Sequence, residues 1–155
     1  MSAVLKDLAA DFRPMADADI AEIIAIEQSA YAHPWTEILF GDCLRAGYCC
    51  WVMHLEGAII AYGIVSVGAG ECHVLNLCVK PEMQNNGYGS AMLEYLLDIA
   101  RGHNVDTAFL EVRPSNRAAI RLYEKAGFNE VGLRSNYYPA IAGHEDAIIL
   151  ARALV

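Results

Sequence analysis

The segment from residue 71 to residue 101 constrains the fold more than any other part of the chain. It begins with the strand-like run ECHVLNLCV at 71–79 and ends with an amphipathic pattern at 88–101. Apolar residues in that second part recur about every 3.6 positions, which indicates a helix. Gly87 ends the short loop between the two, and Gly89 lies in the first helical turn. The segment therefore predicts a β-strand, a tight loop and a helix that opens with glycines.

This loop suits an anion. Backbone N–H groups in the first turn of a helix have no intrahelical acceptor, and the helix dipole places partial positive charge there. Glycines let a phosphate approach the backbone closely, so the loop predicts a phosphate site. Met92 excludes the dinucleotide pattern G-x-G-x-x-G, and the absence of a following Gly-Lys-Ser/Thr excludes a P-loop. An ordinary glycine-containing loop remains the alternative.

The remaining patterns predict an α/β (α+β) fold. A meander of strands comes first, followed by alternating helices and strands. We expect residues 1–155 to form one domain, with a single mixed, mostly antiparallel sheet of six to seven strands flanked by about four helices. The expected strands cover 48–55, 58–67, 71–79, 107–112, 128–138 and 143–154, and the expected helices start at 20, 36, 88 and 115.

Two of these helices carry recognisable start signals. Asp19, with Glu22 three residues later, is typical of a capping box. Ser115 is the expected N-cap of the last helix, and Gly127 lies just past its end. Both signals support short helices that begin at defined residues.

Composition narrows the class of protein. Hydrophobic residues make up 55% of the chain and charged residues 19%, which is typical of a folded domain and not of a disordered one. The net charge of -8, with no basic face, argues against direct nucleic-acid binding. The longest apolar stretch, 58–67, is shorter than the ~20 residues of a membrane helix, and the N-terminus shows no secretory signal. We expect a cytoplasmic monomer or weak dimer that does not bind membranes. Its acidic surface suits a cationic substrate, with solubility alone as the alternative.

The cysteines and histidines give no metal pattern. The five cysteines are odd in number and include no C-x-x-C pair, which favours reduced core thiols. His144-Glu145 begins like a zincin motif, but Ile148 stands where the second histidine is required. We therefore expect no metal.

A family resemblance emerges at the glycine loop. The pattern Val79-x-Pro81-x-x-Gln84-x-x-Gly87-x-Gly89 resembles the acetyl-CoA pyrophosphate loop of the GNAT superfamily of N-acetyltransferases, Q/R-x-x-G-x-G/A. The resemblance implies acetyl-CoA as co-substrate and no metal. The implied cofactor-binding residues are Leu77, Cys78, Val79, Gln84, Asn85, Asn86, Gly87, Tyr88, Gly89, Ser90 and Asn116.

One departure from the family pattern concerns charge. The family usually has Arg or Lys at the positions of Asn85 and Asn86, so the cationic contribution to phosphate binding is reduced here. The candidates to replace this positive charge are the basic residues Lys80, Arg117, Arg121 and Lys125.

Further segments narrow the resemblance. The stretch LEVRPSNRAAIRLYEKAGF at 110–128 resembles the later GNAT motif, in which an Asn at a helix start contacts the cofactor and a Tyr reaches its sulfur. With His33-Pro34-Trp35, RSNYYP at 134–139 and GHEDAIIL at 143–150, the chain resembles the RimI-like branch, the ribosomal-protein-alanine N-acetyltransferases. That branch acts on the N-terminal alanine of a small-subunit ribosomal protein.

The resemblance implies a reaction and roles for its residues. The α-amine of a protein N-terminus attacks acetyl-CoA directly, without a covalent enzyme intermediate. Glu111 is the implied base, acting through water, the Val79 backbone N–H stabilises the oxyanion, and Tyr123 is the implied acid for the leaving sulfur. The alternatives are an ion pair with Arg113 for Glu111 and core packing for Tyr123. Cys78 is interpreted as a core or cofactor-lining residue and not as a nucleophile.

The peptide groove has three aromatic candidates, Trp35, Tyr137 and Tyr138, with core packing as the alternative for Trp35. Glu145 and Asp146 are candidates for holding a cationic amine, with a solvated charge pair as the alternative. Two other functions stay open on the residues alone: acetylation of a small-molecule amine, and a non-catalytic acetyl-CoA-binding module.

Overall fold

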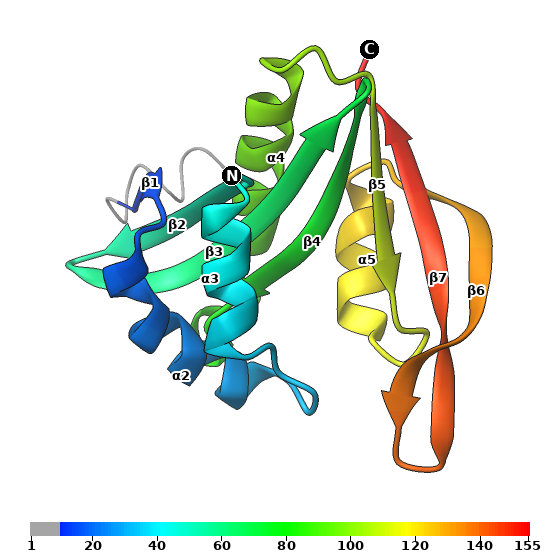
Figure 1. Ribbon diagram of the computed structural model, residues 1–155, viewed down its shortest axis with the longest axis horizontal. Helices are drawn as coiled ribbons and strands as arrows, with labels where there is room; N and C mark the ends of the chain where they lie inside the picture. Colours follow the sequence, from blue (N-terminus) through cyan, green and yellow to red (C-terminus); the bar gives the residue numbers. More distant parts are fainter. Residues whose placement is uncertain (1–9) are drawn as a thin grey trace.

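A computed structural model describes residues 10–155, and its centre is a seven-stranded sheet (Figure 1). The strand order is β1-β2-β3-β4-β5-β7-β6, and all neighbours are antiparallel except β4 and β5, which are parallel. The expected mixed, mostly antiparallel sheet is confirmed. The strands are β1 (Asp11–Pro14), β2 (Cys49–Leu55), β3 (Ala58–Gly68), β4 (Glu71–Val79), β5 (Thr107–Val112), β6 (Asn129–Ala140) and β7 (Gly143–Ala153).

Helices cover both faces of this sheet. Figure 1 shows α2 and α3 in front of the first strands and α4 behind them. On the α4 side, Leu93 and Leu96 are buried against the sheet, and on the α2 side Ile23 and Phe40 are buried. None of the described helices is long and apolar enough to cross a membrane. The helices are α2 (Ile20–Ala30), α3 (Glu37–Arg45), α4 (Tyr88–Arg101) and α5 (Arg117–Lys125).

The parallel strands β4 and β5 pair over four residues only. Their register runs from Glu71 opposite Thr107 to Val74 opposite Leu110, and β4 then continues alone to Val79. Figure 1 shows the two ribbons diverging beyond this point, on either side of α5. The last residues of β4 therefore have a strand neighbour on one side, β3, and none on the other.

A bulge in β4 lies at the start of this unpaired part. Ile64 of β3 is opposite Asn76, but Val65 is opposite Val74, so one extra residue is accommodated in β4. A single inserted residue reverses the alternation of side chains along a strand. Accordingly Val74 and, after the bulge, Leu77 both pack on the α4 side, whereas Cys78 belongs to the α2 side.

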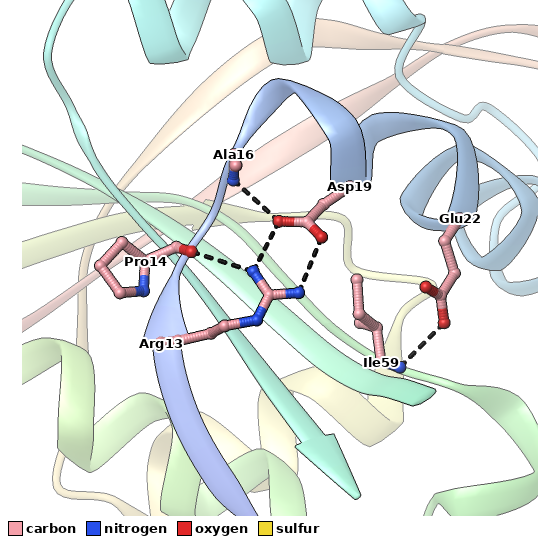
Figure 2. Close-up of polar contacts among 6 residues, drawn as sticks. All are labelled: Arg13, Pro14, Ala16, Asp19, Glu22 and Ile59. Carbon is pink, nitrogen blue, oxygen red and sulfur yellow. Dashed lines mark hydrogen bonds and ion pairs between the residues drawn. The ribbon is translucent and has the colours of Figure 1, made fainter. Parts of the chain in front are cut away.

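Helix α2 is attached to the sheet by two carboxylates (Figure 2). Asp19 accepts hydrogen bonds from both terminal nitrogens of Arg13, each at 2.8 Å, and from the Ala16 N–H at 2.8 Å. Glu22 accepts from the backbone N–H of Ile59, at 2.8 Å. The expected Asp19–Glu22 capping box is therefore wrong, because Glu22 is engaged by a neighbouring strand and does not bond back to the helix start.

The start of α5 also differs from the expectation. Asn116, not Ser115, is the N-cap, and its side-chain oxygen accepts from the Ala119 N–H at 3.2 Å. The Ser115 hydroxyl and N–H instead donate to Glu145, both at 3.0 Å. All five cysteines are free thiols, as the odd number and spacing indicated.

Gly63 provides a test of the packing between β3 and α4. A Cβ at this position would lie 2.4 Å from Cδ1 of Leu96, which is fully buried. Gly63→Ala is therefore expected to lower the free energy of unfolding by about 1–3 kcal/mol, as for other overpacked cores. Urea unfolding measures this change. Gly68→Ala in the same strand is the control, because its Cβ has nothing within 4 Å; equal stability of the two variants would contradict the packing shown here.

Candidate active site

A cleft of about 740 Å³ opens where β4 and β5 separate. Its walls come from the end of α2, the unpaired end of β4, the first turn of α4 and one face of α5. The lining residues include Tyr31, Leu77, Val79, Gln84, Asn85, Gly87, Gly89, Ser90, Asn116, Ala119, Arg121, Leu122, Tyr123 and Lys125.

The glycine loop forms one end of the cleft. Gly87 is the N-cap of α4 with φ +85°, a conformation that glycine adopts at little cost. No side chain caps this helix start, so the first N–H groups of α4 remain available to a ligand. Gln84 donates from its side chain to the Val79 carbonyl at 3.1 Å, and this bond ties the loop to β4. These features support the expected phosphate site, which stays a prediction.

Three residues predicted to bind the cofactor do not line the cleft. The side chain of Tyr88 is buried in the core. Asn86 donates to the Met83 and Gln84 carbonyls at 3.2 and 3.0 Å, so its side chain braces the loop from within. The Cys78 side chain points to the α2 side, and burial raises the pKa of its thiol to about 11. A buried thiol of this kind is a poor nucleophile, and only backbone groups of Cys78 remain to contact a cofactor.

Helix α5 forms the opposite wall. Tyr123 lines the cleft with only 8% of its surface exposed, and burial raises the pKa of its hydroxyl, which stays protonated at neutral pH. Arg121 and Lys125 lie on the same wall, whereas Arg117 and Lys80 are not among the lining residues. Of the basic residues considered from the sequence, two are therefore placed where they can meet phosphate.

Glu111 lies near the end of β5 and is not among the residues that line the cleft. Both its oxygens accept from one terminal nitrogen of Arg134 on β6, each at 3.1 Å. The alternative of an ion pair with Arg113 is wrong, because Arg113 bonds to Glu145 at 3.2 Å and to the Pro139 carbonyl at 2.6 Å.

The aromatic candidates lie in different environments. Tyr137 and Tyr138 are adjacent on β6, and each ring lies under a guanidinium, at 4.2 Å for Arg134 and 4.4 Å for Arg113. Burial, and then the neighbouring Glu111, raise the pKa of Tyr138 to about 12. Trp35 is partly buried and packs against Phe40 of the core cluster on the α2 side.

The two acidic candidates are already engaged. Glu145 accepts from Ser115 and from Arg113, which holds the pKa of its carboxyl below the usual range. Asp146 accepts from the Asn136 N–H at 2.9 Å. Glu145 ties β7 to the loop between β5 and α5, and Asp146 ties β7 to β6, so holding a cationic amine would require them to exchange partners.

Comparison with known proteins decides the family. The model of the acetyltransferase (GNAT) family matches residues 11–128. The chain belongs to the GNAT acetyltransferases. A [ribosomal protein bS18]-alanine N-acetyltransferase from Escherichia coli K12 is 43% identical over 133 residues, covering 86% of this chain and 90% of the relative. A protein of the same name from Haemophilus influenzae is 34% identical over 134 residues, covering 86% and 91%.

Solved structures agree with this assignment. The crystal structure of the ribosomal-protein-S18-alanine N-acetyltransferase from E. coli superimposes with a TM-score of 0.87, 39% identity and 94% coverage of both chains. Ard1 from Thermoplasma volcanium gives a TM-score of 0.85 at 26% identity, covering 95% and 99%. The expected GNAT fold is confirmed, and acetyl-CoA is the co-substrate of this acetyltransferase.

The cleft of this GNAT enzyme fits acetyl-CoA. The uncapped start of α4 offers N–H groups for a pyrophosphate, the unpaired end of β4 offers backbone groups for the pantetheine arm, and Tyr123 lies on the facing wall. Sequence reasoning missed Tyr31, whose hydroxyl donates to the Leu77 carbonyl at 2.8 Å. The available signal was the aromatic residue directly after the predicted helix and before Pro34.

Gly89 tests the phosphate end of the cleft. A Cβ there would lie 3.2 Å from Leu122 Cδ1 and 3.6 Å from Val79 Cγ2, so the methyls of a larger side chain must enter the cleft. Gly89→Val is expected to weaken acetyl-CoA binding about tenfold or more, which is ~1.4 kcal/mol. Isothermal calorimetry measures the affinity, with Gly68→Val as a control in open space. A folded Gly89→Val protein with normal affinity would show that the cofactor lies elsewhere.

Substitutions of Arg121 and Lys125 test which side chains supply positive charge for the phosphates of coenzyme A. Each is expected to contribute up to ~1 kcal/mol to coenzyme A binding, as in an exposed ion pair, and the contribution should shrink as salt rises. Arg121→Gln and Lys125→Gln should therefore weaken binding at low salt, whereas Arg117→Gln should not. Calorimetry at two salt concentrations measures this. Equal losses in all three variants would indicate a general effect of net charge instead of contacts in the cleft.

Proposed function

We propose that this GNAT enzyme transfers the acetyl group of acetyl-CoA to the α-amine of an N-terminal alanine, on a small-subunit ribosomal protein of the bS18 type. The observation that carries the proposal is its 43% identity, over 90% of the relative, to an enzyme named for that reaction. Such a substrate is a protein of the cytoplasm, which is where we place the reaction. The acidic net charge of -8 suits a basic ribosomal partner.

The amine must be neutral to attack. A protein α-amine has a pKa of about 7.7–8.0, against about 10.4 for lysine, so it needs only modest help near neutral pH. We assign that help to Glu111, which accepts the amine proton through water. The GNAT-like motif that contains Glu111 supports this role, and Arg134 of β6 holds its carboxylate near the end of β5.

Two further groups act on the atoms that change charge. The Val79 N–H lies at the unpaired end of β4, where a donor can stabilise the oxyanion of the tetrahedral intermediate. Tyr123 supplies a proton or hydrogen bond to the sulfur that leaves. Its raised pKa supports this role, because the hydroxyl remains a donor over the working pH range.

The proposed contacts of the peptide are three aromatic residues. They are Tyr137 and Tyr138, on β6, and Trp35, in the loop after α2.

The proposed substrate is tested with labelled acetyl-CoA and a peptide that begins with Ala and contains an internal Lys. Mass spectrometry is expected to find acetyl only on the α-amine. The same peptide with a blocked N-terminus is the control and should stay unmodified. Acetylation of the lysine, or of neither group, would refute this substrate.

The separate roles of Glu111 as base and Tyr123 as proton donor are tested by the pH dependence of kcat/KM. Glu111→Gln keeps the shape but removes the base, so kcat/KM should fall by about 10²–10⁴-fold near neutral pH. The loss should lessen as pH rises above the pKa of the substrate amine, because the amine then arrives neutral. Tyr123→Phe lacks the donor at every pH and should show no such recovery. Acetyl-CoA affinity should change little in either variant if both groups act in the transition state. Equal, pH-independent losses would make Glu111 a structural residue held by Arg134.

A further inference from the structure

Glu27 is a buried carboxylate that the proposed reaction does not use. It lies on α2 with 1% of its surface exposed, and within residues 10–155 no ion pair reaches it. Burying an acidic side chain is costly unless hydrogen bonds satisfy its oxygens. A carboxylate retained at such a place is therefore expected to organise the groups around it.

The donors to Glu27 come from three separate segments. Oε1 accepts from the Tyr62 hydroxyl on β3 at 2.5 Å and, at a longer 3.4 Å, from the side-chain nitrogen of Asn76 on β4. Oε2 accepts from the backbone N–H of Trp35, in the loop between α2 and α3, at 3.0 Å. One carboxylate thus connects α2, the loop after it and two neighbouring strands.

Two of these segments lead directly into the cleft. Asn76 is the first residue after the bulge in β4, and the next residue, Leu77, lines the cleft. The loop held at Trp35 begins with Tyr31, which also lines the cleft and donates from its hydroxyl to the Leu77 carbonyl at 2.8 Å. The backbone of β4 and the loop after α2 are therefore held against each other, with Glu27 behind both.

We propose that Glu27 is a positioning residue, which sets the distance between the unpaired end of β4 and the loop 31–35 from the rear of the cleft. The proposal rests on the proposed function, because these two segments border the places given above to the oxyanion donor Val79 and to the incoming peptide. Small displacements of such groups cost rate more than affinity, because transition-state geometry is more demanding than binding.

Glu22 gives a matched control on the same helix. Both glutamates accept a backbone N–H from another segment, Glu22 from Ile59 at 2.8 Å and Glu27 from Trp35 at 3.0 Å. The Glu22 contact, drawn in Figure 2, attaches α2 to the start of β3 and involves no cleft residue. Glu22→Gln and Glu27→Gln therefore make the same chemical change on the same helix, Glu22 at an exposed position away from the cleft and Glu27 at a buried one behind it.

The experiment compares wild type, Glu22→Gln, Glu27→Gln and Tyr62→Phe in kcat on an Ala-starting peptide, acetyl-CoA affinity and stability to urea. We expect kcat to fall about tenfold or more in Glu27→Gln, and in the same direction in Tyr62→Phe. Acetyl-CoA affinity should change far less, because the glycine loop that holds phosphate is untouched. Glu22→Gln should lose stability but keep its kcat.

Backbone hydrogen exchange followed by NMR separates this inference from the substrate assignment. Exchange at the Trp35 amide should accelerate in Glu27→Gln, and exchange at the Ile59 amide in Glu22→Gln, whether or not the peptide is a substrate. If wild type leaves the peptide unmodified, the proposed function fails, and this exchange pattern still tests what Glu27 holds. Unchanged kcat in Glu27→Gln, equal kcat losses in both glutamate variants, or unchanged exchange at Trp35 would each overturn the positioning role.

Discussion

The separation of β4 from β5 after four paired residues is the constraint on which the site depends. A buried strand edge leaves N–H and C=O groups that require partners. In this structure two carbonyls of the β4 end are bonded by side chains, Leu77 by the Tyr31 hydroxyl and Val79 by the Gln84 amide. Both donors come from segments that border the cleft. The separation of the two strands thus creates the cleft, and the carbonyls that it leaves unpaired hold the loop after α2 and the glycine loop at the edge of the cleft.

Local patterns in the sequence were sufficient for the elements around the phosphate end. Helix α4 runs from Tyr88 to Arg101, as its apolar spacing indicated, and Gly87 has the positive φ that a glycine at this helix start permits. These features depend on neighbours within a few residues. The strand, loop and helix were therefore predictable before any tertiary contact was known.

Contacts between distant segments were not predictable in the same way. Glu22 was expected to bond back to the start of its own helix, but it accepts a hydrogen bond from the backbone N–H of Ile59 on β3 instead. An ion pair with Arg113 was the alternative role for Glu111, but Arg113 lies past the end of β5 and bonds to Glu145, and Arg134 on β6 reaches Glu111 instead. β1 was missed because four residues are too few to show alternation. Glu27 shares the buried face of α2 with Ile23 and Ile26, and its partner Tyr62 lies on a strand distant in the sequence.

The bulge in β4 has a practical meaning for anyone wishing to alter the acyl group that this enzyme accepts. Because the alternation reverses at the bulge, the odd-numbered positions beyond it, Leu77 and Val79, line the cleft, while the even-numbered Asn76 and Cys78 face the cluster around Glu27 and Tyr62. Mutant libraries designed to enlarge the cleft for longer thioesters therefore have few usable positions on this strand. Substitutions at the odd positions change the shape of the cleft, whereas substitutions at the even positions disrupt the packing and hydrogen bonds that hold the strand in place.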